Sequence, residues 1–313
     1  MGRLPKFLDA RIGSGEQMSQ LTNVVERYNA ADGEFEYLVK RIESASFSME
    51  PFRHLLLADF LSPNHLALIT GSEQIRLPAA TTHEELLEGL DAAGYSVEPF
   101  PGCTTDVVDY LRCINAGEWP VGNGVVEGFG LAMRLRKIRE PLLERLVAFL
   151  NGERFQCVLA AKFDVVRPTR IETAIQKYLT GYEISPHPDI RSKCLTYLLN
   201  INTHAVADEL SIHTHLLRFK HTKEFLYSFW ESNPEFERFW VPWEWCTTET
   251  VTSANNSILL FAAHDRSLHA VKLKYDHLNF QRTQIYGNLW YTDVPFLTGN
   301  TLTYKQFDFQ VST

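Results

Sequence analysis

Apolar residues in the first half of the chain recur every three or four positions, which is the spacing of an amphipathic helix. The clearest case lies within residues 16–44 and is broken near Gly33. Three further helices are predicted, over residues 63–70, 82–93 and 134–150. Pro141 is expected either to kink the last of these or to begin a new helix. We therefore expect residues 1–150 to be mainly helical, with one short strand at residues 51–61.

After Asn151-Gly152 the pattern changes to short β-branched and aromatic runs separated by turn residues, which predicts strands. The predicted strands cover residues 156–166, 170–183, 193–201, 210–219, 257–262, 268–274 and 282–291. Helices followed by many strands, without regular strand-helix alternation, indicate a mainly β fold with helical support. We predict a double-stranded β-helix (a cupin-like jelly roll) at residues 151–293, with the N-terminal helices on one side and a tail at residues 294–313. We expect residues 1–313 to form a single catalytic domain.

Residues 220–256 form an insertion rich in large aromatic side chains, and they contain four of the six tryptophans. One interpretation is a helix and loop that pack their aromatic residues on the outside of the barrel, because such side chains provide much buried area. The other is a lid over the barrel mouth that forms a wall of the substrate pocket. The sequence leaves both interpretations open.

Composition narrows the class of protein. The net charge of −8 argues against binding to nucleic acid, which depends on Lys and Arg. No apolar run approaches the roughly eighteen residues of a membrane span, and the N-terminus lacks the apolar run of a signal peptide. The five cysteines are scattered without a C-x-x-C pair and are expected to be reduced. We expect a cytoplasmic protein of undetermined oligomeric state, with no nucleic acid or membrane partner.

The strongest chemical signal is the His-x-Asp sequence of His187 and Asp189, which is followed on a later predicted strand by His269. Two imidazoles and one carboxylate are the ligand set of a mononuclear non-haem iron(II) site, which leaves coordination positions open. The residues therefore predict a metal site made of His187, Asp189 and His269.

These strands resemble those of the Fe(II)/2-oxoglutarate-dependent dioxygenases, particularly the prolyl-hydroxylase-like branch. Residues 178–189, which read YLTGYEISPHPD, are similar to the strand that ends in His-x-Asp in this family. Residues 195–200 resemble the strand behind the metal, and residues 256–271 resemble the strand pair that carries the distal histidine. Arg282 falls on the next strand, where the family places a basic residue.

The resemblance implies that the protein uses Fe(II), 2-oxoglutarate and O2, and releases succinate and CO2. It implies that Arg282 anchors the distal carboxylate of 2-oxoglutarate, which a planar guanidinium fits well. Tyr178 and Tyr182 are candidates for hydrogen bonds to the co-substrate, although they could equally fill the barrel. Lys272 is nearer to His269 in sequence than Arg282, but alternation places it on the other face of the strand. The same resemblance implies that the protein hydroxylates rather than halogenates its substrate, because Asp189 supplies a carboxylate ligand.

The substrate is less constrained than the chemistry. We expect a small molecule such as an amino acid, a sugar or a secondary metabolite, and the alternative is a prolyl-type hydroxylase that acts on a protein. Four basic residues flank the metal-bearing strand and could meet an anionic substrate, although most are expected to be solvated surface charges: Lys162, Arg167, Arg191 and Lys193.

A rival metal site is also present in the sequence. His213 and His215 share one face of a predicted strand, and with His264 and Asp265 they could form the site of a zinc-dependent hydrolase or a cupin-like enzyme. The competing interpretation is that they are polar residues at the barrel mouth. A non-catalytic binding jelly roll is a third class, but a pure binder has no need of the triad together with Arg282.

Overall fold

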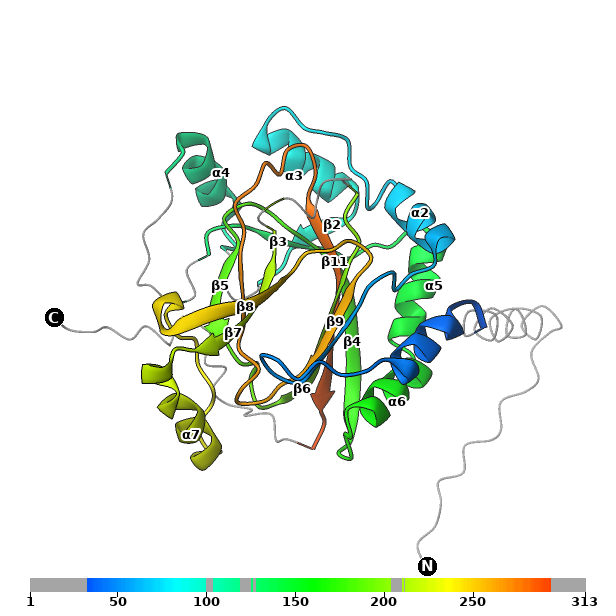
Figure 1. The fold of residues 1–313 in the computed structure, drawn as a ribbon. Helices are drawn as coiled ribbons and strands as arrows, with labels where there is room; N and C mark the ends of the chain where they lie inside the picture. The colour runs from blue at the N-terminus through cyan, green and yellow to red at the C-terminus, as the bar shows by residue number, and fades with distance from the viewer. Residues whose placement is uncertain are drawn as a thin grey trace, which may run out of the picture.

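The computed structural model describes residues 33–99, 104–118, 125, 128–203, 210 and 212–293 (Figure 1). Within these residues the chain forms a mixed α/β structure with two antiparallel sheets. The seven-stranded sheet has the order β1-β9-β6-β11-β4-β3-β2, and the four-stranded sheet has the order β5-β10-β7-β8. Residues 16–32 of the first predicted helix and the predicted tail at 294–313 lie outside the described residues.

The strands of the larger sheet are β1 (His54–Leu57), β2 (Tyr95–Val97), β3 (Ala132–Leu135), β4 (Thr169–Tyr178), β6 (Lys193–Asn200), β9 (Ile258–Ala262) and β11 (Arg282–Tyr291). Those of the smaller sheet are β5 (Glu183–His187), β7 (Thr214–Phe219), β8 (Cys246–Thr252) and β10 (His269–Lys272). Successive strands of the second half mostly alternate between the two sheets, so residues far apart in the sequence come to face one another.

The helices are a segment at 33–44, α2 (Pro63–Gly71), α3 (His83–Ala92), α4 (Val107–Ala116), α5 (Pro141–Leu150), α6 (Glu153–Lys162) and α7 (Phe225–Ser232), with short 3-10 turns η2 (His221–Lys223) and η3 (Trp243–Trp245). The predicted starts of α2 and α3 are confirmed by their caps. The side chain of Ser62 accepts from the backbone N–H of His65, and that of Thr82 accepts from Glu85.

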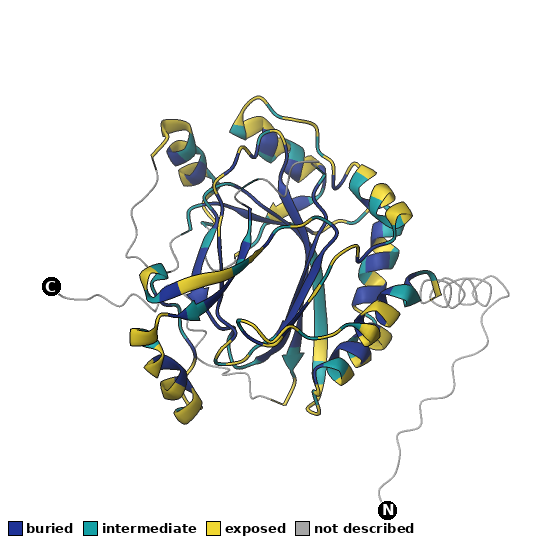
Figure 2. Cartoon of the chain, viewed as in Figure 1, coloured by how far each residue is buried: buried dark blue, intermediate teal, exposed yellow. Residues whose placement is uncertain are grey.

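The two faces of the larger sheet differ in character. Because successive strand residues point to opposite faces, Ile175 on β4 and Ile285 on β11 join the apolar core shared with the helices, which also contains Phe149. The helices α5 and α6 cover this face, and their buried sides are turned toward the strands (Figure 2). Gln176 and Gln284 occupy the opposite face and are also buried. The inner face therefore carries buried polar residues beside apolar ones such as Leu198, and buried polar groups of this kind point to a site.

Two predicted elements are wrong in type or in where they begin. Residues 156–166 are not a strand but largely the helix α6, whose buried Phe155, Val158 and Leu159 follow helical spacing. The predicted helix at 134–150 begins only at Pro141, because residues 132–135 form the strand β3. Pro141 stands in the first turn of α5, where a missing N–H costs nothing.

The segment 220–256 is only partly an insertion. It holds α7 and η3 and then ends in β8, which pairs with β7 at the edge of the smaller sheet. Within the described residues, no helix combines the length and the apolar character needed to cross a membrane.

Candidate metal centre and its cavity

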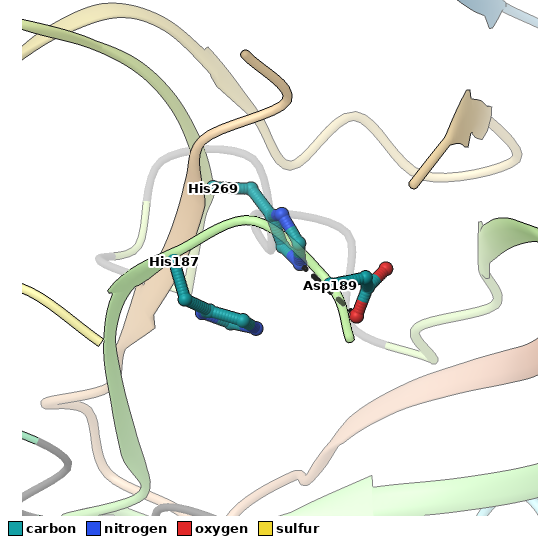
Figure 3. Close-up of side chains that lie close together, drawn as sticks. All are labelled: His187, Asp189 and His269. Carbon is teal, nitrogen blue, oxygen red and sulfur yellow. Dashed lines mark ion pairs between the residues drawn. The ribbon is translucent and has the colours of Figure 1, made fainter. Parts of the chain in front are cut away.

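The three predicted metal ligands meet because of strand pairing. His187 ends β5 and His269 begins β10, and the two residues are direct partners across this antiparallel pair. Asp189 follows two positions after His187, and all three residues are buried. One potential ligand atom from each lies within 4.8 Å of the others (Figure 3). The sequence therefore brings together two imidazoles and a carboxylate, the donor set that suits iron(II).

Backbone carbonyls orient both imidazoles. Nδ1 of His187 lies 2.8 Å from the carbonyl oxygen of Ser185, and Nδ1 of His269 lies 3.0 Å from that of Ser267. A carbonyl oxygen can only accept, so each Nδ1 carries the hydrogen and donates it. Nε2 of each ring then keeps a lone pair that can bind a metal. A hydrogen bond from the other ring nitrogen to a carbonyl oxygen is the usual second contact of a metal-binding histidine.

Burial favours the neutral form of both histidines. It lowers the pKa of His187 to about 3, with a further contribution from neighbouring His269, and it also lowers the pKa of His269. Metal binding requires neutral imidazoles. The pair is therefore in the correct protonation state at neutral pH.

Asp189 accepts hydrogen bonds on both carboxylate oxygens. Nζ of Lys193 donates to Oδ1 at 2.6 Å, and Oγ1 of Thr196 donates to Oδ2 at 2.6 Å. Burial alone would raise the pKa of Asp189, but the charge and the hydrogen bond of Lys193 hold it below its usual range. Burial alone would lower the pKa of Lys193, but the charge and hydrogen bond of Asp189 raise it. The two side chains are therefore oppositely charged and paired inside the protein.

Lys193 differs from the other flanking basic residues. Its side chain is only 9% exposed, so the expectation of a solvated surface charge is wrong for it. Lys162 and Arg167 do reach the surface, where Arg167 pairs with Asp293. Arg191 is partly buried and pairs with Asp265.

A cavity of about 280 Å³ opens beside the triad, between the inner faces of the two sheets. Its walls include polar residues of β11 and β6 on one side and residues of β5, β7 and β10 on the other. Trp240 from the aromatic segment also lines it, and the ring of Trp240 lies 6.2 Å from that of His187. The backbone N–H of Val241 donates to the carbonyl of Pro186 at 2.9 Å, which holds this segment along β5.

Arg282 points into this cavity and is 1% exposed. Its Nη2 donates to Oγ1 of Thr214 at 2.9 Å, and its guanidinium carbon lies 5.2 Å from the ring centre of Tyr178. Among the described residues, no carboxylate lies within ion-pair distance of Arg282. Burying a charge without a counter-charge is costly. The arrangement therefore fits an anionic group brought by a ligand, as the predicted co-substrate would bring.

Tyr178 and Tyr182 both line the cavity near Arg282, with ring centres 4.9 Å apart. The hydroxyl of Tyr178 donates to Oε1 of Gln176 at 2.7 Å. Lys272 lies elsewhere, because its exposed ammonium pairs with Glu183. The structure thus places Arg282, and not Lys272, on the cavity side, as strand alternation predicted.

The rival zinc site is not assembled. The rings of His213 and His215 are 6.2 Å apart, and His215 contacts the hydroxyl of Thr248 on the neighbouring strand. Asp265 is engaged with Arg191 and Arg238. In the part of the chain that the structure describes, the triad is the only group of three or more His, Cys, Asp or Glu side chains arranged to hold a metal.

Sequence reasoning missed two residues of the site, Thr196 and Thr214. Thr196 gave a weak signal, because it is a polar residue in the apolar middle of β6, whereas Thr214 gave none, because β7 also contains His215 and Arg218. Trp240 was counted with the aromatic segment, but no local pattern distinguished it from its neighbours.

No protein-family model and no curated protein matches the sequence. Among solved structures, the chain is similar to a prolyl-4-hydroxylase from Pseudomonas putida, with 9% identity over 82% of this chain and 98% of that chain and a TM-score of 0.40. It is also similar to a prolyl hydroxylase from Trichoplax adhaerens, solved with a peptide fragment of the hypoxia inducible factor oxygen degradation domain. That match has 12% identity over 86% of this chain and 92% of that chain, with a TM-score of 0.38.

Both structures are prolyl hydroxylases, the branch that the sequence motif resembles. At such low TM-scores and identities, we base the function on the side chains of the cavity alone.

Proposed function

We propose that this protein is an Fe(II)- and 2-oxoglutarate-dependent oxygenase that hydroxylates an unactivated C–H bond of a small molecule. One observation carries the proposal: a complete set of two histidines and one carboxylate shares a cavity with the buried guanidinium of Arg282. A metal site alone would suit many reactions. A second, anion-binding position in the same cavity suits a metal-chelating dicarboxylate.

The order of the strands supports a jelly roll. Of the eight strands from β4 to β11, the first pairs with the last and the third with the sixth in the larger sheet. The second pairs with the seventh and the fourth with the fifth in the smaller sheet. This nested pairing is expected when a long hairpin is rolled into two facing sheets, as in the cupins.

Each residue has a separate task in this proposal. His187, His269 and Asp189 would hold Fe(II), and Arg282 with Thr214 would bind the distal carboxylate of 2-oxoglutarate. When bound, the iron, with O2 and the co-substrate, supplies the oxidising power for C–H hydroxylation and yields succinate and CO2. Tyr178 and Tyr182 would line the co-substrate end of the cavity and exclude water from it.

The size of the cavity supports a small-molecule substrate. Its volume of about 280 Å³ lies at the lower end of the roughly 300–1,000 Å³ that is usual for ligand pockets. Trp240 covers part of it, in keeping with the lid interpretation of the aromatic segment. The cavity would have to hold the co-substrate as well, which leaves little room for an extended peptide.

The direct test uses the purified protein under anaerobic conditions with Fe(II) and 2-oxoglutarate. We expect a metal-to-ligand charge-transfer band, and we expect His187→Ala to remove both this band and succinate formation in air. His213→Ala is the matched control, because His213 lies outside the triad, and it should leave the band in place. A wild-type protein that binds neither metal nor 2-oxoglutarate would overturn the proposal.

Substrate class can be tested by following substrate-stimulated succinate formation with metabolite pools and with peptide pools. Stimulation by metabolites alone is expected. Stimulation confined to peptides would replace the small-molecule proposal with a peptidyl hydroxylase.

A further inference from the structure

The cavity is lined by a second buried cation besides Arg282, Lys193, which neither coordinates the metal nor anchors the co-substrate in the proposed function. Five cavity-lining residues alternate along β11: Arg282, Gln284, Tyr286, Asn288 and Trp290. Arg282 and Trp290 are eight positions apart, or about 26 Å along an extended strand. Lys193 on β6 is the direct partner of Trp290. The backbone of Lys193 therefore lies toward the end of β11 away from Arg282, and its ammonium lies between Asp189 and Tyr286.

The surroundings of Lys193 fix its position but leave it able to bind a ligand. Its Nζ lies 2.6 Å from Oδ1 of Asp189 and 3.3 Å from the hydroxyl of Tyr286. The rings of Trp290 and Tyr286 stand 5.5 and 5.8 Å from the ammonium. An ammonium has three N–H donors. One donor thus remains for a further acceptor in the cavity.

The charges of the site leave a positive excess. With a divalent metal and doubly charged 2-oxoglutarate bound, the positive charges of the metal, Lys193 and Arg282 exceed the negative charges of Asp189 and the co-substrate by one. The carboxylate of Asp189 must then both bind the metal and accept the hydrogen bond of Lys193. An unbalanced buried charge is costly, so a further anion beside Lys193 would be stabilised.

The acidic residues at the rim do not supply that anion. Glu98 and Glu172 both lie 3.2 Å from Nη1 of Arg134. Glu98 also pairs with Arg136, and Glu172 pairs with Arg170. This rim cluster contains more arginines than glutamates, so it adds no negative excess to the cavity.

We infer that the substrate carries a carboxylate and that Lys193 binds it, beside the rings of Trp290 and Tyr286. This inference rests on the proposed function. Arg136 and Arg170 of the rim are half-exposed and screened by solvent, so the buried excess stays at one charge. This excess matches a carboxylate, whereas a phosphate monoester carries about −1.5 to −2 at neutral pH. The carboxylate of the substrate would thus orient the molecule through Lys193, a cation separate from the co-substrate anchor.

The experiment compares small carboxylic acids with their primary amides, which have nearly the same shape but no charge. Each compound is titrated into the anaerobic protein with Fe(II) and 2-oxoglutarate, and the change in the charge-transfer band gives a Kd without turnover. At least one acid is expected to bind about tenfold or more tightly than its amide, the usual effect of a charged hydrogen bond. Equal binding of acids and amides, or binding of no acid in the panel, would overturn the inference.

Variants separate this role from a role in holding Asp189. Lys193→Met should bind Fe(II) more weakly, because Asp189 loses a partner, but at saturating Fe(II) it should still form the charge-transfer band and lose only the preference for acids. Lys193→Arg should restore part of this preference. Lys223→Met is the matched control, because Lys223 also lies over a tryptophan ring, that of Trp245, but outside the cavity. Circular dichroism checks that each variant is folded.

Two outcomes distinguish a failure of this inference from a failure of the proposed function. A folded Lys193→Met protein without the band at saturating Fe(II) would show that Lys193 serves the metal site and would overturn the assignment to the substrate. A wild-type protein without the band would overturn the proposed function, and this inference with it.

Discussion

The hydroxyl of Thr196 donates a 2.6 Å hydrogen bond to Oδ2 of Asp189, while Oδ1 of the same carboxylate lies 4.0 Å from Nε2 of His269. Thr196 belongs to β6 in the larger sheet, whereas Asp189 follows β5 of the smaller sheet. The bond therefore ties the two sheets together at the metal centre. It also fixes the rotation of the carboxylate and thereby determines which oxygen faces the histidines.

Replacing Thr196 with Val should weaken metal binding, because valine keeps the shape but cannot hold the carboxylate. Loss of such a partner of a metal ligand typically lowers affinity by about 10–100-fold. Anaerobic Fe(II) titration of the purified protein measures the change. Thr247→Val on the exposed part of β8 is the control and should bind the metal as the wild type does. An unchanged affinity in Thr196→Val would show that Lys193 alone holds Asp189.

Replacing Arg282 with Lys tests the anchoring of the co-substrate. Lysine keeps the charge but loses the planar fork and the contact with Thr214, so we expect the Kd for 2-oxoglutarate to rise by about tenfold or more. The affinity for Fe(II) in the absence of 2-oxoglutarate should stay the same. Titration with 2-oxoglutarate at saturating Fe(II), followed by the charge-transfer band, gives the Kd for 2-oxoglutarate. A separate anaerobic Fe(II) titration without 2-oxoglutarate gives the affinity for the metal.

The control for this substitution is Arg218→Lys, since Arg218 is a half-exposed residue of β7. If Arg282→Lys bound 2-oxoglutarate normally, the anion-binding position would have to be assigned elsewhere in the cavity.

The sequence predicted best those strands that are both buried and bounded by turn residues. The predicted run at 282–291 coincides with β11, and those at 193–201 and 257–262 differ from β6 and β9 by one residue at one end. In contrast, the helix α6 was read as a strand. Its β-branched and aromatic residues favour a strand by composition, but their spacing buries one side of a helix against the sheet.

The metal ligands were predictable because two of them lie in one short motif and the third begins a recognisable strand. The contacts around these ligands could not be predicted from the sequence. Lys193 is close to Asp189 in sequence, but whether its ammonium turns inward depends on the walls formed by Tyr286 and Trp290 from β11. Trp240 reaches the cavity only because the segment before η3 is held along β5. Such contacts follow from sheet pairing over long sequence separations, which local patterns do not encode.

Gly287 provides a test of the packing behind the site. It lies on β11 on the face opposite the cavity, and a Cβ at this position would overlap the ring of Tyr197 on β6. We expect Gly287→Ala to destabilise the protein by about 1–3 kcal/mol, as is usual for overpacking a core. Urea unfolding measures the difference. Gly89→Ala within α3 meets no such obstacle and should be neutral or stabilising, and equal effects of the two substitutions would contradict the packing argument.

His277 should make the stability of the protein depend on pH. The backbone N–H of Thr180 donates to its Nδ1 at 2.9 Å, so this nitrogen is unprotonated, and its Nε2 lies 3.0 Å from Nδ1 of His83. Burial, with a smaller contribution from His83, lowers the pKa of His277 to about 3. An unfolded histidine titrates near pH 6.5. The unfolded chain therefore takes up a proton that the folded chain refuses, and stability falls as the pH drops from about 6.5 toward about 3.

His277→Asn keeps an acceptor for Thr180 but removes the titrating ring, so its free energy of unfolding should fall less steeply with decreasing pH. The measurement is urea unfolding at about pH 7 and about pH 5 for the wild type and the variant. His221→Asn replaces an exposed histidine and is the control, which should keep the slope of the wild type. Parallel pH profiles for the wild type and His277→Asn would mean that His277 takes up its proton in the folded protein as readily as in the unfolded chain.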